Sequence, residues 1–332
     1  MVNCVSKRID WIDIAKGIAI ISVILGHSVG KGPLGILIYS FHMPIYFRLS
    51  GYTIKKIPAS DIPRATLKDF QRLIIPVFIL FFIDSILQIF YLGNNVTDVI
   101  KYKVRAILFG TLHKGMGRLW FLVALFWAKL FYRVFLLKTL RYRVVFLLIG
   151  AYLCSIIQIQ LPQNLDIMFI ILFFMETGFL LKNSIDENSD KVEKIGICAF
   201  FVWSCLIWYR QIYLDIAVRF YPPLSILCAV CGSLCIIQLS KFLECNALIN
   251  KILSFLGKFS MYLLCIHYLN AYFIEYTTLL NFQGEKLSRL NLALHCFVNV
   301  LLHIVILLIF ILLKFFITGI KNKFRNSYQK GL

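Results

Sequence analysis

Apolar stretches about 20 residues long, separated by short charged segments, run through almost the whole chain and leave it few possible folds. Of its 332 residues, 60% are hydrophobic and only 15% are charged, and the mean hydropathy is +0.81. Stretches of this length allow a helix to cross a bilayer, and they lack the apolar–polar alternation of a barrel strand. Because lipid offers no partners to backbone polar groups, helices remain as the way to span it. The sequence predicts an all-α, polytopic transmembrane helical bundle.

The apolar stretches indicate about ten spans within a single domain that covers residues 1–332. The spans are expected near 11–29, 34–54, 72–92, 118–138, 142–160, 164–182, 194–214, 219–240, 259–280 and 292–318. The first span is interrupted by Lys16 and is not followed by an A-x-A-like cleavage site. We therefore interpret it as an uncleaved signal anchor.

The distribution of Lys and Arg predicts how the bundle is oriented. With a cytoplasmic N-terminus, the cytoplasmic loops collect most of these charges, and both termini lie on that side of the inner membrane. The segment 93–117 is the exception, because Lys101, Lys103, Arg105 and Lys114 would face outward. It predicts either an interfacial amphipathic helix or a miscounted span. Basic loops against an anionic leaflet explain the net charge of +19, so we expect the lipid bilayer as a partner and no nucleic acid.

The first span carries three ionisable residues, Asp13, Lys16 and His27, within DWIDIAKGIAIISVILGHSV. Such groups cost several kcal/mol at membrane depth, so a helix that only anchors the chain has no use for them. Lys16 and His27 are eleven positions apart, which places them within about 20° of the same helical face and roughly 16 Å apart along the axis. Asp13 and Lys16 lie on adjacent turns, where they can neutralise each other. The spacing predicts a functional site along one face of this helix.

Further polar residues lie inside the other predicted spans. His42 precedes Pro44 in a segment whose helix this proline interrupts, a context that opens the backbone to a ligand. Glu176 has no partner in its own helix, so it either pairs elsewhere in the bundle or lines a cavity. Ser260 and His267 are seven positions apart and share a helical face.

Two groups of potential metal ligands are better explained by helix packing. His295, Asn299 and His303 follow one another at four-residue intervals without a carboxylate nearby. Cys228, Cys231 and Cys235 share a helical face in an apolar context that also lacks His and carboxylate side chains. We therefore expect no metal site.

Four segments resemble the motifs of one family, in that family's order: RIDWIDIAKGIAIISVILGHS, FHMPIYFRLSGY, GRLWFLVALF and GKFSMYLLCIHYLN. With these motifs the chain resembles the acyltransferase-3 family of integral membrane acyltransferases, in particular its fucose 4-O-acetylase-like branch. The resemblance implies an O-acetyltransferase of the cell envelope that modifies polysaccharide. The acyl group, most often acetyl from acetyl-CoA, goes to a hydroxyl of an extracytoplasmic glycan or its lipid-linked precursor. No permanently bound cofactor is implied, because acetyl-CoA or another acyl-CoA is a co-substrate and the saccharide is the acceptor.

The family's basic residue and histidine on the first span fall on Lys16 and His27, although many members have arginine at the first position. Lysine keeps the charge but loses the bidentate geometry of a guanidinium. We expect His27 to act as the general base, assisted by Lys16 and Asp13, with an acyl-histidine intermediate as the other mechanism. The expected substrate- or cofactor-binding residues are His42, Arg48, Ser50, Arg118, Trp120, Glu176, Ser260 and His267.

A transporter or flippase of glycolipid or small anions is the alternative from another functional class. Buried Lys, His and Glu side chains also serve ion-coupled pathways, so residue spacing does not separate the two functions. Release of free CoA from acetyl-CoA in the presence of an acceptor glycan would separate them.

Overall fold

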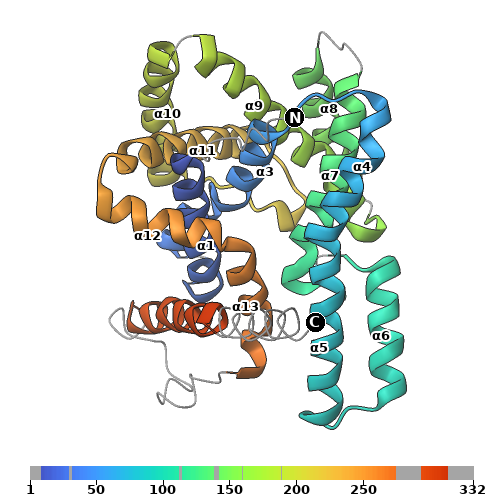
Figure 1. Cartoon of the computed structure of the whole chain (residues 1–332). Coiled ribbons are helices and arrows are strands. Elements are labelled where there is room, and N and C mark those ends of the chain that lie inside the picture. The colour runs from blue at the N-terminus through green and yellow to red at the C-terminus, as the bar shows by residue number, and fades with distance from the viewer. Residues whose placement is uncertain are drawn as a thin grey trace, which may run out of the picture.

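The structure is a computed structural model that describes residues 9–29, 32–111, 114–137, 142–158, 160–187, 189–273 and 293–312. Helices make up the regular structure of these residues, which confirms the all-α prediction for them (Figure 1). The α-helices are α1 (Asp10–Val29), α2 (Pro33–Tyr39), α3 (His42–Thr53), α4 (Ile62–Asp69), α5 (Ile75–Phe90), α6 (Val96–Phe109), α7 (Trp120–Leu137), α8 (Arg143–Ile157), α9 (Met168–Glu187), α10 (Ser189–Arg210), α11 (Pro223–Glu244), α12 (Ala247–Lys258), α13 (Ser260–Phe273) and a last helix at Ala293–Leu312. Short helical turns lie at Ala59–Asp61, Phe70–Ile74, Gly117–Leu119, Pro162–Ile167 and Ile216–Val218.

Six helical segments in the described part of the chain are long and apolar enough to cross a membrane. They are Asp10–Val29, Ala59–Phe90, Gly117–Leu137, Pro162–Ser184, Pro223–Glu244 and Ala293–Leu312. The count rises to seven if α12 and α13, which meet at an angle of 60°, form one bent span. The chain is therefore a membrane protein, but the predicted number of about ten spans is not confirmed.

Two predicted spans differ from the structure for local reasons. The span predicted at 34–54 forms two short helices, α2 and α3, which are separated at Ser40 and Phe41. Pro44 lies in the first turn of α3, where its missing N–H is tolerated, so the chain starts a new helix there. The span predicted at 142–160 is α8, whose 15 residues reach only about 22 Å at a rise of ~1.5 Å per residue. The spans predicted at 259–280 and 292–318 extend beyond the described residues.

Helix α1 lies in the interior of the bundle, where it contacts α3, α11, α12 and α13. Figure 1 shows α4–α8 together on one side of the molecule and α10–α13 on the other. Helix α9 packs against α3, α7 and α8 and so connects the two sides. The buried apolar residues form two clusters, and α1 contributes to both, with Ile20 and Ile24 in one and Ala15 and Ala19 in the other. Residues of α1 are therefore held from several directions.

Two glycines allow α1 and α12 to approach backbone to backbone. A Cβ atom at Gly257 of α12 would lie 1.7 Å from the carbonyl oxygen of Asp13, and a Cβ atom at Gly17 of α1 would lie 2.2 Å from that of Leu253. Small residues are the usual means of close helix contact in membranes, where dispersion replaces the hydrophobic driving force. The register of α12 along α1 is therefore set by this pair of glycines.

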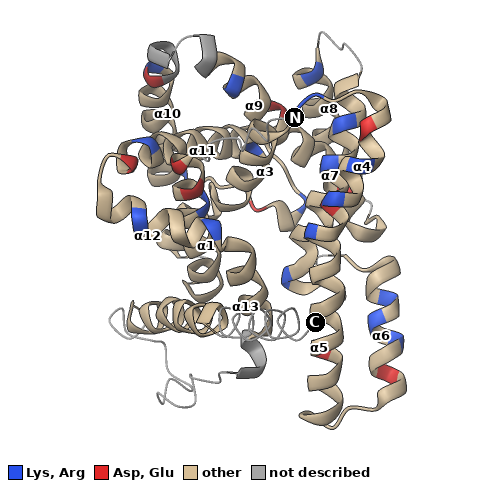
Figure 2. Ribbon diagram, viewed as in Figure 1, with Lys and Arg blue, Asp and Glu red and all other residues tan. Residues whose placement is uncertain are grey.

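Helix α6 forms within the segment 93–117, whose basic residues are unexpected for an outward-facing loop. Lys103 is buried and forms an ion pair with Asp84 of α5, while Lys101 and Arg105 are exposed. Figure 2 shows basic residues along α6. Helix α6 packs against α5, so the charge of Lys103 is neutralised inside the protein by Asp84. The position of α6 at the membrane interface stays a prediction.

Replacement of Gly257 by Ala is expected to destabilise the bundle. Alanine has the better helix propensity, but here its Cβ would clash with backbone, and overpacking of this kind costs about 1–3 kcal/mol. We expect a lower melting temperature in a thermal series followed by fluorescence-detected size exclusion. Gly32→Ala is the control, because no atom lies within 4 Å of the added Cβ. An unchanged melting temperature for Gly257→Ala would contradict the close α1–α12 contact.

Candidate functional site

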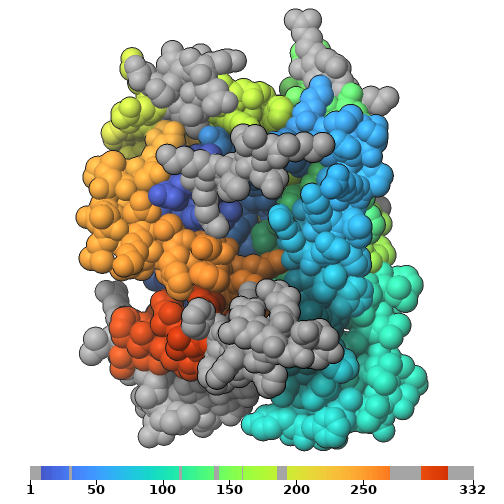
Figure 3. Space-filling view, viewed as in Figure 1, coloured from blue at the N-terminus to red at the C-terminus, as the bar shows by residue number. Residues whose placement is uncertain are grey.

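A cavity with a volume of about 620 Å³ is lined by α1, α2, α3, α7, α12 and α13. Short connecting segments at Arg72–Leu73, Gly117–Arg118 and Asp215–Ala217 complete its wall. Figure 3 shows that the molecular surface is hollowed between α12 and α4. Seven of the predicted site residues line the cavity: Lys16, His27, His42, Ser50, Arg118, Trp120 and Ser260.

Three helices extend along this cavity and each brings polar groups to both of its ends. Helix α1 carries Lys16 and His27 roughly 16 Å apart, as the sequence predicts. Helix α3 carries His42 at its start and Thr53 at its end. In the Gly117–Leu137 segment Lys129 follows Arg118 by eleven positions, the same spacing as on α1. The cavity is therefore long, with chemically different ends.

The first end, called here the cationic end, holds Lys16, Arg72, Lys129 and Lys258. Lys258 belongs to this end because its neighbour Gly257 packs against the backbone of Asp13, one turn before Lys16. Neither Arg72 nor Lys258 forms an ion pair within the described part of the chain. Two cations from different segments of the chain thus face the same space without an ion pair of their own.

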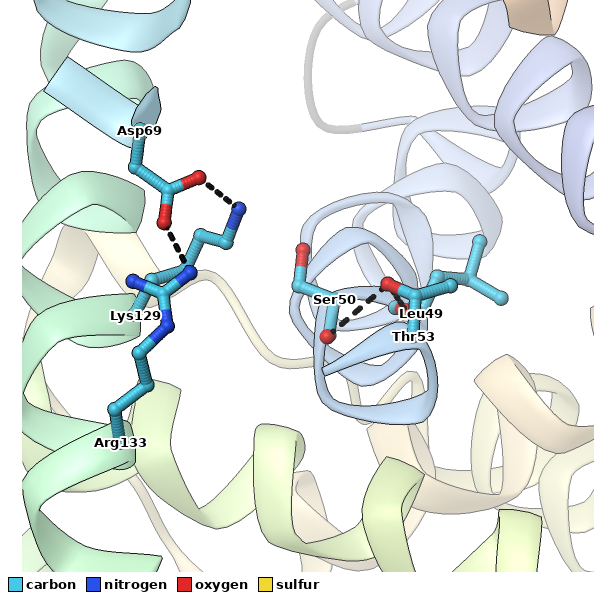
Figure 4. Close-up of polar contacts among 6 residues, drawn as sticks. All are labelled: Leu49, Ser50, Thr53, Asp69, Lys129 and Arg133. Atoms are coloured by element: carbon cyan, nitrogen blue, oxygen red, sulfur yellow. Dashed lines mark hydrogen bonds and ion pairs between the residues drawn. The ribbon is translucent and has the colours of Figure 1, made fainter. Parts of the chain in front are cut away.

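Lys129 and Lys16, in contrast, each have a carboxylate close by. Lys129 Nζ lies 2.5 Å from Asp69 Oδ1, and Arg133 binds the other oxygen of the same carboxylate. Figure 4 shows this group across from Ser50 and Thr53 of α3, whose side chains also line the cavity. Lys16 Nζ lies 3.9 Å from Asp13 Oδ1, a long ion pair between adjacent turns of α1. Asp13 itself is buried and outside the cavity wall.

The second end, called here the histidine end, holds His27, His42 and Arg118. His27 is exposed and borders the cavity, whereas His42 is buried. The Nδ1 atom of His42 lies 3.0 Å from the carbonyl oxygen of Ile38. A carbonyl only accepts, so Nδ1 carries the proton and the lone pair of neutral His42 resides on Nε2. One imidazole at this end therefore has a defined tautomer.

His267 lies behind His27 and does not line the cavity. The centres of the two rings are 5.0 Å apart, and the His267 side chain is 1% exposed. The Nδ1 atom of His267 lies 3.1 Å from Nε2 of His303, and the His303 Nδ1 atom lies 2.7 Å from the carbonyl oxygen of Asn299. The sequence favoured helix packing for His303 and Asn299. No local pattern relates them to His267, which lies 36 residues before His303.

Arg48 does not reach the cavity, contrary to the expectation of a substrate-binding role. Its guanidinium is buried and donates hydrogen bonds to Thr177 Oγ1 at 3.1 Å, to the Val230 carbonyl oxygen at 2.8 Å and to Ser233 Oγ at 2.8 Å. These acceptors belong to α9 and α11. Arg48 therefore joins three helices, a role that its own segment of sequence does not reveal.

Glu176 also lies away from the cavity wall. Its Oε2 atom accepts a hydrogen bond from the Tyr132 hydroxyl at 2.7 Å, and its Oε1 atom lies 3.1 Å from Nε of Arg143. Of the two roles left open by the sequence, pairing within the bundle is the one observed. Its place as a binding residue is not supported by this position.

Metal ligands do not gather in the described part of the chain: no three or more His, Cys, Asp or Glu side chains there are arranged to hold an ion. The polar side chains of the cavity are mostly imidazoles, hydroxyls and cations, with the carboxylate of Asp215 also in the wall. This set of groups suits proton transfer and the binding of anions.

Comparison with known proteins identifies the family of this membrane chain. A family model described as an acyltransferase domain matches residues 9–319. The chain belongs to the acyltransferase-3 family. The match covers α1, the cavity helices and the Ala293–Leu312 helix, so this member of the acyltransferase-3 family is a membrane acyltransferase. No curated protein and no solved structure matches the chain.

Glu176→Gln is expected to lower stability without removing acyltransferase activity. The amide keeps an acceptor for Tyr132 but leaves Arg143 without its carboxylate, and an unsatisfied buried partner costs about 1–3 kcal/mol. Melting temperature and acyltransferase activity per folded molecule are the two measurements. The control is Glu193→Gln, a change at an exposed residue of α10. Loss of turnover at an unchanged melting temperature would return Glu176 to the site.

Proposed function

We propose that this protein transfers an acyl group, most simply acetyl, from acyl-CoA to a hydroxyl of an extracytoplasmic or lipid-linked saccharide. The observation that carries the proposal is the single cavity that joins the cationic end to the histidine end. An acyl-CoA has phosphates far from its reactive thioester, so it needs cations at one end of its site and acid–base groups at the other. Membership of the acyltransferase-3 family supports acyl transfer. The acyl-CoA donor and the saccharide acceptor are what the resemblance to the fucose 4-O-acetylase-like branch implies.

At the histidine end, His27 acts as the general base. The acceptor hydroxyl oxygen attacks the thioester carbonyl carbon while a nitrogen of His27 takes the hydroxyl proton. The guanidinium of Arg118, which lines the same end, stabilises the negative charge that develops on the carbonyl oxygen. The carbon–sulfur bond then breaks and the proton passes from His27 to the sulfur, so that an ester and free CoA leave. In the rival route His27 itself attacks and becomes acylated, which would release CoA before acceptor is added.

At the cationic end, Arg72, Lys258 and Lys16 bind the phosphates of the donor. Lysine and arginine are both suited to phosphate, the first as a point charge and the second as a bidentate donor. The predicted orientation, with a cytoplasmic N-terminus in the inner membrane, puts this end on the side where CoA is made. The acceptor then approaches the histidine end from the other side.

His27→Ala is expected to abolish acyl transfer while the protein remains inserted and abundant. Loss of a general base costs about 10²- to 10⁴-fold in rate, and the substitution leaves the apolar length of α1 intact. The measurement is transfer of radiolabelled acetyl from acetyl-CoA to an envelope-glycan fraction, together with release of free CoA. His295→Ala is the control, because His295 does not line the cavity. A His27→Ala protein with at least half the normal activity would rule out the assignment. A wild-type protein that releases no CoA would favour the transporter alternative.

Lys258→Gln and Arg72→Gln are each expected to raise the KM for acetyl-CoA about tenfold and to leave kcat unchanged. One charge-assisted contact to phosphate accounts for about 1.5–3 kcal/mol, and the reacting groups are at the other end of the cavity. The matched substrate is acetyl-pantetheine, which has no phosphate and should show the same KM with wild-type and variant proteins. Lys101→Gln, a change at an exposed residue of α6, is the control variant. Equal effects on both substrates would contradict phosphate binding here.

A further inference from the structure

We propose that His267 is a positioning residue that holds His27 in its basic tautomer, and that His303 and the Asn299 carbonyl hold His267 in turn. The proposal rests on the proposed acyl transfer at His27. The role goes beyond binding of substrate, because His267 does not line the cavity and His303 lies on a different helix.

The backbone carbonyl oxygen of Asn299 fixes the direction of the hydrogen bonds between Asn299, His303 and His267. The Asn299 carbonyl oxygen, 2.7 Å from His303 Nδ1, only accepts, so that nitrogen of His303 carries a proton. In a neutral imidazole the other nitrogen then carries a lone pair, and His303 Nε2 accepts from His267 Nδ1 at 3.1 Å. His267 Nδ1 is therefore protonated, and its Nε2 atom must carry a lone pair.

The lone pair of His267 Nε2 has no hydrogen-bond donor among the described residues, although the atom is buried. An unsatisfied buried polar atom is costly and calls for an explanation. The ring of His27 is the adjacent imidazole, with a centre-to-centre distance of 5.0 Å and an angle of 36° between the rings. The hydrogen-bonded pair His267–His303 has almost the same arrangement, 5.1 Å and 45°. An N–H of His27 is thus within reach of His267 Nε2 by a small rotation of its side chain.

This contact would determine which nitrogen of His27 is basic. One nitrogen of neutral His27 keeps its proton and donates a hydrogen bond to His267 Nε2. The other nitrogen then carries the lone pair and can take the hydroxyl proton of the acceptor. After that transfer His27 is an imidazolium, and its bond to His267 becomes a stronger, charge-assisted one. The proton then leaves to the CoA sulfur, so no proton passes along the chain of histidines. His267 orients and stabilises the base without a change in its own protonation.

Two further contacts hold the chain of groups against the cavity wall. Arg118 Nη1 donates to the backbone carbonyl oxygen of His267 at 2.5 Å. Asn299 Nδ2 donates to Ser28 Oγ at 2.7 Å, one residue after His27 on α1. The Ala293–Leu312 helix is therefore fastened to α1 beside the proposed base. These contacts fix the position of His267 and His303 relative to His27, as a positioning residue requires.

The test compares His267→Asn with His267→Gln in full-length protein reconstituted in nanodiscs. The asparagine amide reaches the position of Nδ1 and can still donate to His303, but it has no acceptor where Nε2 lies. The glutamine amide reaches the position of Nε2 and can accept from His27. We expect kcat for acetyl transfer from acetyl-CoA to an envelope-glycan fraction to fall about 10- to 100-fold in His267→Asn, less than the loss of a base would cause. His267→Gln should stay within a few-fold of wild type, and KM should be unchanged in both. Equal kcat values in the two variants would overturn the proposal.

A second measurement identifies the tautomers of His267 and His303 and does not require enzyme activity. ¹⁵N NMR of histidine-labelled protein, with each of the six histidines assigned by substitution, should show His267 and His303 protonated on Nδ1. The resonance of His267 Nε2 should shift in His27→Ala, which removes its donor. A proton on His267 Nε2, or no shift, would overturn the proposal even if the wild-type protein transfers acetyl. Correct tautomers in a wild-type protein that transfers no acetyl would instead place the failure in the proposed function.

Discussion

Desolvation is the constraint that decides where the charges of this bundle lie. An ionised side chain that loses its hydration inside an apolar bundle regains that free energy only through a close partner. Four buried carboxylates in the described residues have found cationic partners on other segments of the chain: Asp69 with Lys129 and Arg133, Asp84 with Lys103, Asp166 with Arg219, and Glu176 with Arg143. Three of these carboxylates are paired with another helix, and Asp166 and Arg219 join two connecting segments, so the same contacts that neutralise charge also order the bundle.

The remaining polar groups of the cavity are the ones that a ligand can meet. Arg72 and Lys258 face the cavity from different segments without a carboxylate partner in the described part of the chain, and His27 is exposed there. The cavity keeps these groups hydrated or ready for an anionic substrate, which removes the cost of burying them. Lys129 and Lys16 have both properties, because each lines the cavity and lies close to a carboxylate.

Hydrogen bonds between neutral groups are a second way to offset the desolvation of buried polar side chains. In the proposed tautomers, the chain from His267 through His303 to the backbone carbonyl of Asn299 contains no formal charge, so its burial requires only that donors and acceptors match. Arg48 shows the opposite case, because its charge is stabilised by three hydrogen bonds to neutral acceptors from two helices. Both arrangements depend on residues that are far apart in the sequence.

The sequence alone determined the helical class, the membrane setting, the family and the long face of α1 that carries Lys16 and His27. These features follow from composition, motif order and helical periodicity, which are local properties of the chain. The sequence left the role of Glu176 open, predicted a binding role for Arg48 and favoured helix packing for His303. Only the tertiary structure shows the contacts of these three residues, because the partners of each lie on other helices, 129 or more positions away for Arg48 and 36 for His303. The predicted number of about ten spans is not confirmed, and hydropathy does not reveal the breaks at Phe41 and Phe259 that divide helices in the described part of the chain.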